Sequence, residues 1–451
     1  MSLNAAAWER LAPAPAIDAA ELQLRALGAG AGHIVAWLGH NRHEMLATLA
    51  ASRRLGCVLM PLNWRLSATE LAALLRHAGV AHMIHWPETA ALAQAVLAQS
   101  PLQAGPASGI EPGDLLLVYT SGTTAAPKGA LHTADGMLAN ARAALAAQGL
   151  DEHSRVLAVL PTFHVGGLCI QLLPALMTGA QVLLQPRFEP VAWFDALEQA
   201  RPSTCLLVPA VMRSLIEHPR WAGADLASLD FVCAGSQIVP PALIEAFHAR
   251  GVPVAQVYGA TETGPVSLVL PPQEAMTAGA RSGRPALGVQ IRLAADGEIL
   301  LKAEQMMRGY HRAPGEAFDA EGWFHTGDLA LRHADGLYEV VGRSKELIIS
   351  GGENIHPAEI ENLLLGHPDI AECALVGLPD ARWGELPVLA VVPQPGRSCD
   401  LASLQPVWEG HVARFKHPRQ LLLLPELPKT ALGKVQRAAL VAQLVEQVDR
   451  R

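Results

Sequence analysis

The sequence lacks the features that mark nucleic-acid binders. Charged residues form only 17% of the chain, and 34 Lys and Arg stand against 42 Asp and Glu, which gives a formal charge of −8. The basic residues are scattered along the chain rather than clustered. Because general binding to nucleic acid needs a concentrated positive surface, the composition argues against a nucleic-acid partner.

Cysteine is scarce as well. The chain has six cysteines, and they form no CxxC pair and no His/Cys spacing of a metal site. A disulfide framework or a structural zinc site depends on such spacing. The cysteines stand at positions 57, 169, 205, 233, 373 and 399. We therefore expect buried, reduced thiols in a cytoplasmic protein.

Long hydrophobic runs are missing too. The longest uncharged stretch, residues 156–186, is interrupted by Pro161, His164 and Gln171, whereas a membrane-spanning helix needs about 20 predominantly apolar residues. Residues 1–18 lack the basic start and the continuous apolar core of a signal peptide. The sequence predicts neither a transmembrane segment nor a signal peptide.

The chain does have hydrophobic residues at half of its 451 positions, which is enough for more than one domain. Short apolar runs alternate with Ala/Leu-rich stretches of helical length, a pattern that favours a mostly parallel sheet covered by helices. The predicted strands are 33–38, 156–160, 181–184, 204–208, 231–234 and 254–257. The predicted helices include 21–27, 43–55, 136–148, 191–200 and 240–250.

Two later regions follow a different pattern. Residues 291–303 contain short alternating runs around an Asp-Gly turn, which predicts a hairpin-rich β subdomain. After Arg343, a predicted helix over 357–365 is combined with strands near Ala371 and Val388. This mixture predicts a small α+β domain in the last hundred or so residues.

The segment from Leu115 to Ala130 carries the most chemical information. Four apolar residues run into a loop of hydroxyls, glycines and a single lysine, Lys128. Small residues let backbone N–H groups approach an anion, while hydroxyls and a compact ammonium add further phosphate partners. It is not a Walker loop, because the lysine lies between Pro127 and Gly129. An ordinary surface loop has the same composition, so these residues alone leave both interpretations open.

The order Tyr-Thr-Ser-Gly-Thr-Thr-x-x-Pro-Lys-Gly resembles the signature loop of the adenylate-forming superfamily. This superfamily contains acyl- and aryl-CoA synthetases, peptide-synthetase adenylation domains and beetle luciferases. Further segments resemble its motifs in the same order, namely Pro-Thr-Phe-His from Pro161, Tyr-Gly-Ala-Thr-Glu-Thr from Tyr258, Trp-Phe-His-Thr-Gly-Asp from Trp323, Gly-Arg-Ser-Lys-Glu from Gly342 and Pro-Lys-Thr-Ala-Leu-Gly-Lys from Pro428. The resemblance covers nearly the whole chain.

The resemblance implies an α/β fold. A large N-terminal domain of mostly parallel sheets with a β-rich subdomain would span residues 1–343, and a small mobile α+β domain would span 344–451, with its hinge at Lys345. The implied activity is that of an ATP- and Mg²⁺-dependent acyl-CoA synthetase, which forms acyl-AMP and pyrophosphate before the thiol of coenzyme A displaces AMP. A ligase that loads a carrier-protein phosphopantetheine and a non-catalytic nucleotide-binding relative are the alternatives.

By the same resemblance, the loop around Lys128 holds the β- and γ-phosphates of ATP. The implied phosphate-binding residues are Thr120, Ser121, Gly122, Thr123, Thr124 and Lys128. The family usually has glycine where this chain has Ala125. The loop therefore either does not need a positive φ at this position or is strained when it closes.

Later motifs are assigned to the nucleoside and the metal. The resemblance implies adenine contacts from Gly235, Ser236, Tyr258 and Gly259. It assigns Thr261 to the α-phosphate and Glu262 to Mg²⁺. Without the other motifs in order, Glu262 would be read as a solvated charge at the end of a strand.

Three further charged residues receive roles from their motifs. The resemblance assigns Asp328 and Arg343 to the ribose, since a carboxylate can accept hydrogen bonds from both ribose hydroxyls and an arginine can complete the site. Lys434 is assigned to the adenylation step, where it neutralises charge as carboxylate and α-phosphate approach each other. Lys429 is predicted to be a bystander. In isolation each of these residues would be a surface charge.

The glycines Gly351 and Gly352 belong to a segment that resembles the family's thiol channel. In the family, rotation of the small domain about the hinge, here Lys345, brings this segment to the active site. One active site would thus perform two reactions by exchanging faces of the small domain.

The acyl site is implied by the Pro161 motif. Phe163 and His164 stand where amino-acid-activating relatives typically have Phe-Asp, so the usual clamp for an α-ammonium group is missing. We predict that His164 is a gate residue at the acyl site. Gly166 and Gly167 are expected to leave room for an acyl or aryl group.

The segments expected to line the acyl pocket contain no Lys or Arg. They are 161–172, 206–212, 231–238 and 258–266. A second substrate carboxylate would need a cationic partner, so an aliphatic or aromatic monocarboxylate is favoured. Arg213 keeps dicarboxylates, including succinylbenzoate, open as an alternative. The sequence also leaves a homodimer open.

Overall fold

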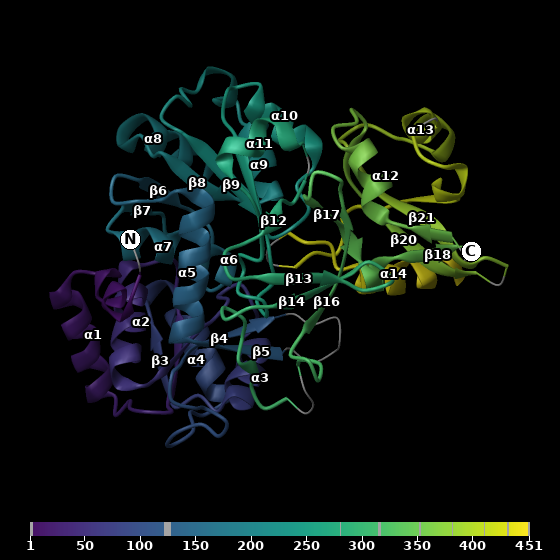
Figure 1. Cartoon of the computed structure of the whole chain (residues 1–451). Helices are drawn as coiled ribbons and strands as arrows, with labels where there is room; N and C mark the ends of the chain where they lie inside the picture. Colours follow the sequence, from purple (N-terminus) through teal and green to yellow (C-terminus); the bar gives the residue numbers. More distant parts are fainter. Residues whose placement is uncertain are drawn as a thin grey trace. The chain divides into compact units, whose positions relative to one another are not determined.

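Figure 1 shows the chain as a computed structural model. The structure describes residues 3–120, 128–279, 281–313, 317–350, 353–380, 382–409, 411–430 and 433–449. Several residues singled out above lie outside this part of the chain, namely Ser121, Gly122, Thr123, Thr124, Ala125, Gly351 and Gly352. Their assignments stay predictions from the resemblance.

A six-stranded sheet borders the predicted phosphate loop. Its strands are β1 Ile34–Leu38, β2 Val58–Pro61, β3 His82–His85, β4 Asp114–Thr120, β5 Lys128–Thr133 and β15 Gly309–Tyr310. Their order is β15-β5-β4-β2-β1-β3. The strands β1 to β4 run parallel, and β5 and β15 are antiparallel additions at one edge. The predicted phosphate loop therefore joins two antiparallel neighbours, β4 and β5.

A seven-stranded sheet follows in the chain. Its strands are β6 Arg155–Ala158, β7 Gln181–Leu184, β8 Thr204–Leu207, β9 Phe231–Gly235, β10 Val254–Tyr258, β11 Leu268–Leu270 and β12 Arg284–Pro285. Their order is β12-β11-β10-β9-β8-β6-β7, and β6 to β10 are parallel. The carboxyl ends of these parallel strands meet at one edge, where α/β proteins bind their ligands.

Helices alternate with these strands, as the sequence pattern predicts. They are α1 Ala14–Ala26, α2 His43–Leu55, α3 Ala68–Ala78, α4 Ala90–Gln99, α5 Ala134–Gln148, α6 Val165–Cys169, α7 Leu172–Thr178, α8 Pro190–Ala200, α9 Pro209–Ile216, α10 Pro241–His248 and α11 Pro272–Ala278. Local sequence sets the limits of α3. Ser67 and Glu70 form a capping box at its start, and Gly79 ends it with a φ of 74°.

One predicted helix boundary is wrong. The sequence predicted a helix over 21–27 after a proline-rich lead, but α1 begins at Ala14 and includes Pro15. Proline is accepted in the first turn because the N–H that it lacks would have no partner within the helix. Ile17 and Leu24 are both fully buried, so packing supports the longer helix.

The central strand β1 is buried on both faces. Val35 and Trp37 belong to a core cluster that also contains residues of α1, α2 and α5. Ile34 and Ala36 belong to a second cluster that contains residues of α3 and α4. Successive side chains of a strand point to opposite faces, which explains why this strand is a continuous hydrophobic run.

The hairpin-rich region forms a separate sheet. Its strands are β13 Gln290–Leu293, β14 Glu298–Lys302, β16 Phe324–Arg332 and β17 Tyr338–Arg343, in the order β13-β14-β16-β17. The predicted Asp-Gly turn lies between β13 and β14. The strands β16 and β17 are antiparallel, and their register pairs Asp328 with Arg343.

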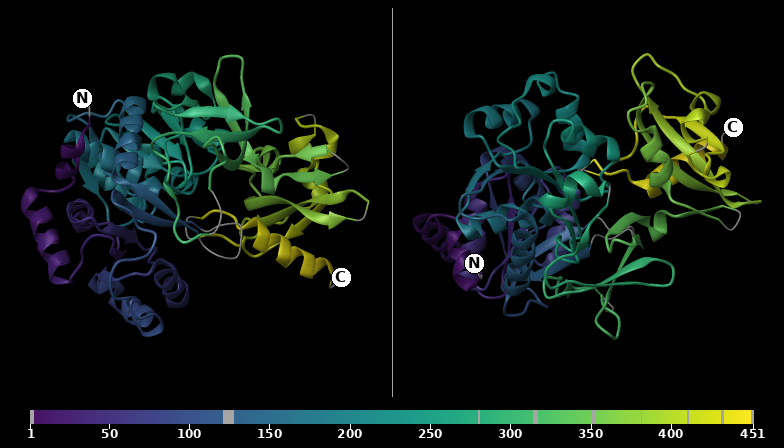
Figure 2. Two further views of the ribbon diagram at one scale, coloured as in Figure 1. Left: turned by 60° about the horizontal axis from the view of Figure 1, so that its bottom comes forward. Right: turned by 45° about the horizontal axis from the view of Figure 1, so that its top comes forward.

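The C-terminal sheet is mainly antiparallel. It comprises β18 Ile348–Ser350, β19 Glu353–Ile355, β20 Ile370–Asp380, β21 Gly384–Pro393 and β22 Gln420–Leu423, together with the helices α12 Pro357–Leu364, α13 Leu401–Trp408 and α14 Arg437–Asp449. Figure 2 shows these elements in light green and yellow. Ile360 of α12 and Leu404 of α13 belong to one core cluster, and Leu440 of α14 belongs to another.

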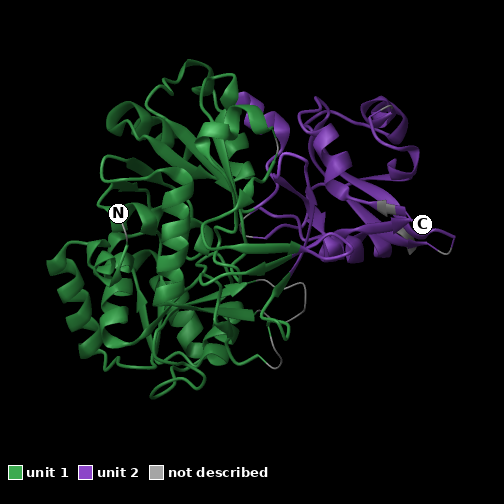
Figure 3. Cartoon of the chain, viewed as in Figure 1, with its two compact units in different colours: residues 1–236, 247–292, 300–325 green, residues 237–246, 293–299, 326–451 purple. Residues whose placement is uncertain are grey.

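The chain divides into two compact units, coloured in Figure 3. One unit consists of residues 1–236, 247–292 and 300–325, and the other consists of residues 237–246, 293–299 and 326–451. The predicted domain boundary after residue 343 and the hinge at Lys345 stay predictions. The predicted fold class is confirmed, because parallel-rich sheets, a β subdomain and a C-terminal α+β region are all present.

Within the described residues, no helix has both the length and the apolar character that a bilayer crossing requires.

Candidate functional site

The carboxylate of Glu262 is held through one of its two oxygens. Glu262 lies in the turn after β10, and its Oε1 accepts hydrogen bonds from the hydroxyl of Tyr310 at 3.0 Å and of Thr120 at 3.4 Å. In the part of the chain that the structure describes, Oε2 accepts no hydrogen bond. One oxygen is therefore fixed, while the other has no hydrogen-bond donor among the residues described.

Lys128 lies beside the same group. Its ammonium is 4.9 Å from the centroid of the Tyr310 ring, a cation–π arrangement. Lys128 begins β5, which pairs with β15. Burial and the Glu262 carboxylate raise the pKa of the Tyr310 hydroxyl, so this hydroxyl keeps its proton and acts as a hydrogen-bond donor. The structure thus brings together Thr120, Lys128 and Glu262, and it adds Tyr310.

Hydrogen bonds fix the turn that carries Glu262. The hydroxyl of Thr263 accepts a bond from the backbone N–H of Ala260 at 2.9 Å and another from the hydroxyl of Ser267 at 2.9 Å. The carbonyl of Glu262 accepts a bond from the N–H of Met307 at 3.0 Å. The carboxylate is therefore presented by a rigid turn.

This turn begins with Gly259 because a side chain does not fit there. A Cβ at Gly259 would lie 2.5 Å from the carbonyl oxygen of Pro265. Thr261 follows and is only partly buried. Both predicted residues therefore lie in the turn that presents Glu262.

Ser236 and Tyr258 lie at the carboxyl ends of neighbouring parallel strands. In the register of β9 and β10, Gly235 is opposite Val257, and a Cβ at Gly235 would lie 2.4 Å from the carbonyl oxygen of Val257. Ser236 has a φ of 67°, a left-handed conformation that is unusual outside glycine. Strained residues of this kind cluster at ligand sites, which agrees with the predicted adenine contacts.

His164 lies directly before α6 and has a buried, unpartnered ring nitrogen. Its Nε2 has no hydrogen-bond partner among the described residues. Burial, with a smaller contribution from the charge of Arg65, lowers the pKa of the imidazole to about 4. The ring is therefore neutral at pH 7. Its centroid is 4.5 Å from that of Phe163, so an aromatic side chain flanks this imidazole.

Arg65 is a cation near His164 that the sequence analysis missed. It lies between β2 and α3, and its guanidinium is 5.0 Å from the centroid of the Trp64 ring. Burial lowers the pKa of Arg65. Arg65 lies outside the segments that were expected to line the acyl pocket, because it belongs to a connection about a hundred positions before His164.

The two glycines of α6 have different surroundings. A Cβ at Gly167 would lie 2.2 Å from the carbonyl oxygen of Pro161, and one at Gly166 would lie 3.1 Å from the hydroxyl of Ser236. Gly167 therefore permits backbone packing and leaves no room for an acyl group, contrary to the expectation above. Gly166 places α6 beside the turn that carries Ser236.

The two predicted ribose ligands face each other across an antiparallel strand pair. Nε of Arg343 is 2.9 Å from Oδ1 of Asp328, and the side chain of Asp328 is only 8% exposed. The register of β16 and β17 accounts for the pairing. The structure thus brings together two residues that are separated in the sequence by a β-hairpin.

Lys434 lies near this pair, in the segment before α14. Its ammonium is 4.0 Å from Oε1 of Glu346, while Arg437 approaches Oε2 of the same carboxylate at 3.2 Å. Burial, followed by the positive charge of Arg343, lowers the pKa of Lys434. The charge of Lys434 is therefore weakly compensated, and an approaching anion would stabilise it.

The other two predicted lysines differ from Lys434. Lys429 forms an ion pair of 2.5 Å with Glu372, so its charge is already compensated. Lys345 is exposed and lies in a short 3₁₀ helix, Ser344–Glu346. These surroundings are compatible with a bystander role for Lys429 and with a hinge at Lys345.

Comparison with known families identifies the chain. The model described as AMP-binding enzyme matches residues 19–311, well over half of the chain. The chain belongs to the AMP-binding enzyme family. A second model, AMP-binding enzyme C-terminal domain, matches residues 359–434. The resemblance that the ordered motifs indicated is therefore confirmed.

Curated members of the AMP-binding enzyme family include close relatives. The chain is 42% identical to an indoleacetate–CoA ligase of Aromatoleum aromaticum, over 92% of this chain and 89% of that protein. It is 38% identical to a feruloyl-CoA synthase of an Amycolatopsis species, over 91% of this chain and 89% of that protein. Both relatives are named for aromatic acids.

Solved structures of the AMP-binding enzyme family share the fold. The o-succinylbenzoate CoA synthetase of Bacillus subtilis, in complex with its acyl-adenylate, has a TM-score of 0.83 at 29% identity, over 94% of this chain and 91% of that one. ATP-bound MatB of Rhodopseudomonas palustris has a TM-score of 0.85 at 26% identity, over 95% and 92%. The predicted enzyme class, an AMP-forming acid–CoA ligase that uses ATP and CoA, is confirmed.

A basic and aromatic patch in the C-terminal part of this AMP-binding enzyme was also missed. Trp383 is 38% exposed, and the guanidinium groups of Arg382 and Arg419 lie 4.9 Å and 5.9 Å from its ring centroid. Asp380 fixes the turn by accepting hydrogen bonds from the N–H groups of Arg382 and Trp383, each at 2.8 Å. Arg382 and Trp383 are adjacent in the sequence. Arg419 is 36 positions later, and only the fold brings it to the same ring.

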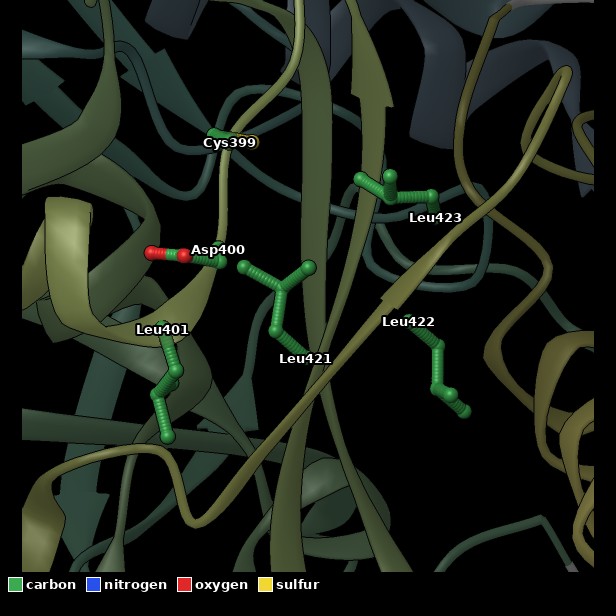
Figure 4. Close-up of a pocket in the computed structure, with 6 residues that line it drawn as sticks. All are labelled: Cys399, Asp400, Leu401, Leu421, Leu422 and Leu423. Carbon is green, nitrogen blue, oxygen red and sulfur yellow. The ribbon is translucent and has the colours of Figure 1, made fainter.

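Two further observations concern metal ligands and a cavity in this family member. Within the described residues, no group of three or more His, Cys, Asp or Glu side chains could hold a metal by itself. A hollow of about 340 Å³ lies in the C-terminal unit. Figure 4 shows the six residues that line it, Cys399, Asp400, Leu401, Leu421, Leu422 and Leu423. Its acidic side chain, Asp400, caps α13 through the N–H of Ser403, and none of the predicted site residues lines this hollow.

Proposed function

We propose that this chain converts an aromatic monocarboxylate, of the arylacetate or arylpropenoate class, into its CoA thioester. A carboxylate oxygen attacks the α-phosphorus of ATP and pyrophosphate leaves. The thiol of CoA then attacks the acyl carbon, the proton of the thiol is lost, and AMP leaves with the acyl carboxylate oxygen. Free CoA, and not a carrier protein, is the proposed acceptor.

The observation that carries the substrate class is the neutral, buried imidazole of His164. Its pKa of about 4 means that the residue in the place of the amino-acid clamp has no charge at pH 7. A neutral ring offers no negative charge to compensate an α-ammonium group, and burying an uncompensated charge is costly. The ring of Phe163 beside it suits an aromatic acid, as do the names of the two curated relatives.

The phosphates and the metal are assigned to one cluster of side chains. Lys128 and Thr120 would meet the β- and γ-phosphates, and Thr261 the α-phosphate. Glu262 fits Mg²⁺, which typically binds one or two carboxylates together with substrate phosphates and water, because its Oε2 accepts no hydrogen bond from the described residues. When bound, the metal would offset the negative charge of the phosphates.

The nucleoside and the adenylation step are assigned to further residues. Ser236 and Tyr258 would contact adenine, and Asp328 with Arg343 would hold the ribose. Lys434 would compensate the charge of the meeting anions. Rotation about Lys345 would then present the other face of the C-terminal domain for thioester formation.

Aromatic acids are expected to support exchange of pyrophosphate with ATP, whereas free α-amino acids are not. A matched pair tests this directly, since 3-phenylpropanoate and phenylalanine differ only by the ammonium group. We expect at least a hundredfold preference for 3-phenylpropanoate, the scale for burying an unpaired charge. Exchange with phenylalanine at a similar rate would contradict the substrate class, and the panel should include indoleacetate, ferulate and hexanoate.

The patch around Trp383 is proposed to bind the phosphorylated nucleotide of CoA. An exposed indole can stack on a base, and the two guanidinium groups suit phosphates. Trp383→Ala is expected to raise the KM for CoA by about tenfold or more, the scale of one lost stacking contact, and Trp383→Phe should retain most of the affinity. The acid-dependent exchange of pyrophosphate serves as the control, because it needs no CoA. An unchanged KM for CoA in Trp383→Ala would remove this assignment.

A dicarboxylate is the second candidate substrate, and the charge of Arg65 near His164 favours it. A guanidinium at this place could pair with a distal carboxylate. If succinylbenzoate is the better substrate and Arg65→Met abolishes that preference, the dicarboxylate proposal replaces the monocarboxylate one.

A further inference from the structure

Tyr310 contacts Glu262, the proposed ligand of Mg²⁺, and Lys128, the proposed partner of the phosphates. Its hydroxyl donates a hydrogen bond to Oε1 of Glu262 at 3.0 Å. The face of its ring receives the ammonium of Lys128 at 4.9 Å from the centroid. The chain contains only four tyrosines, and no motif drew attention to this one.

Backbone hydrogen bonds fix the strand that carries Tyr310, both before and after this residue in the chain. The N–H of Arg308 donates to the carbonyl of Leu131 at 2.7 Å, and the N–H of His311 donates to that of Gly129 at 2.7 Å. These bonds hold β15 against β5, the strand that begins with Lys128. Tyr310 and Lys128 therefore share one rigid frame.

Side chains add a second anchor to this strand. The guanidinium of Arg308 donates two hydrogen bonds of 2.9 Å to the carboxylate of Asp114, whose side chain is completely buried. The ring of His311 is within 3.0 Å of the carbonyl of Ala78. A phenol placed between two such anchors is held in position before any ligand binds.

We propose that Tyr310 is a positioning residue for the adenylation step. Its hydroxyl holds Oε1 of Glu262 so that Oε2 stays free for the magnesium ion, and its ring supports the ammonium of Lys128. The inference rests on the proposed roles of Glu262 and Lys128. Partners that orient a metal ligand often matter nearly as much as the ligand itself.

A tyrosine suits this task better than the alternatives. Phenylalanine would offer the ring to the ammonium but no donor to the carboxylate, and leucine would offer neither. The hydroxyl donates to Oε1 of Glu262, and the ring separately faces the ammonium of Lys128. The two contacts can therefore be removed one after the other.

The test is the binding of ATP to the full chain, measured by titration calorimetry with Mg²⁺ and again with EDTA. Tyr310→Phe is expected to weaken binding of ATP with Mg²⁺ by about tenfold, the lower end of the effect of losing an orienting partner, and to leave metal-free binding unchanged. Tyr310→Leu should in addition weaken metal-free binding by about threefold, since the cation–π contact is lost.

Two further variants make the result specific. Tyr119→Phe is the matched control, because it removes a hydroxyl that bonds to Nδ1 of His77 at 2.7 Å in the same sheet. It should change ATP binding by less than twofold. Glu262→Gln tests the underlying assignment, since it should weaken binding only when Mg²⁺ is present.

The outcomes separate the two levels of the proposal. If Glu262→Gln loses the metal-dependent affinity and Tyr310→Phe does not, the positioning role is wrong while the metal assignment stands. If Glu262→Gln has no effect, the metal assignment itself is wrong. Equal losses by Tyr310→Phe with Mg²⁺ and with EDTA, together with a lower unfolding temperature, would show that Tyr310 only supports the fold.

Discussion

Lys434→Ala is expected to slow formation of the acyl-adenylate by roughly a hundredfold or more, the scale for removing a preorganised charge partner. The ammonium is weakly compensated in the structure, with Glu346 at 4.0 Å. In its proposed role, it compensates charge when two anions, the carboxylate and the α-phosphate, approach each other. The thiol later attacks a neutral carbonyl, so conversion of supplied acyl-AMP and CoA should be largely unaffected.

Single-turnover measurement of each half-reaction checks this expectation. Lys429→Ala is the control, because Lys429 lies in the same segment but is paired with Glu372, and it should leave both steps near their original rates. Equal loss of both steps in Lys434→Ala would contradict the assignment of this lysine to adenylation.

The same assignment predicts a pH dependence. In the proposed role Lys434 acts in its protonated form, and burial and the charge of Arg343 lower its pKa. Adenylation should therefore decline as the pH rises through this lowered pKa, below the range in which an ordinary lysine titrates. Lys434→Arg should lose this alkaline decline, since a guanidinium stays charged.

Lys345→Pro is expected to have the opposite effect and to slow thioester formation. The residue lies in a 3₁₀ turn, whose φ of about −60° a proline can adopt, so the adenylating arrangement should survive. The proposed rotation about Lys345 would need other backbone angles, and a misfit proline costs about 3 kcal/mol, or roughly a hundredfold in rate.

The control for the hinge variant is Lys345→Ala, which removes the charge but leaves φ free. It should behave like the parent enzyme in both half-reactions. If Lys345→Pro slows adenylation as strongly as thioester formation, the alternation of domain faces about this residue is wrong. Thermal unfolding of the variant shows whether the fold has been kept.

Much of the fold could be predicted from the sequence because its periodicity is strong. The strand over 181–184 and the helix over 43–55 have the predicted limits. The start of α1 was missed, because a run of Ala and Pro reads as a linker although Pro15 fits the first turn. Packing of Ile17 against the core settles this boundary, and a single sequence does not show packing.

The sequence predicted those site residues that belong to family motifs, and it missed those that join the site only through contacts in the fold. Thr120, Glu262 and Lys128 follow from ordered segments, and the structure brings them together. Tyr310 and Arg65 come from segments without a motif, and only the tertiary structure relates Tyr310 to Glu262 and Arg65 to His164. The role of a glycine was also ambiguous from the sequence. Gly167 was expected to leave room for substrate, but the nearby backbone of Pro161 excludes a side chain there.

The central claim is that this chain activates an acid as its adenylate and then transfers the acyl group to CoA. The most direct test is exchange of labelled pyrophosphate into ATP with an aromatic acid and without CoA. Exchange should depend on the acid, and later addition of CoA should give one acyl-CoA for each AMP. Formation of ADP and phosphate, or the absence of exchange until CoA is added, would contradict the account.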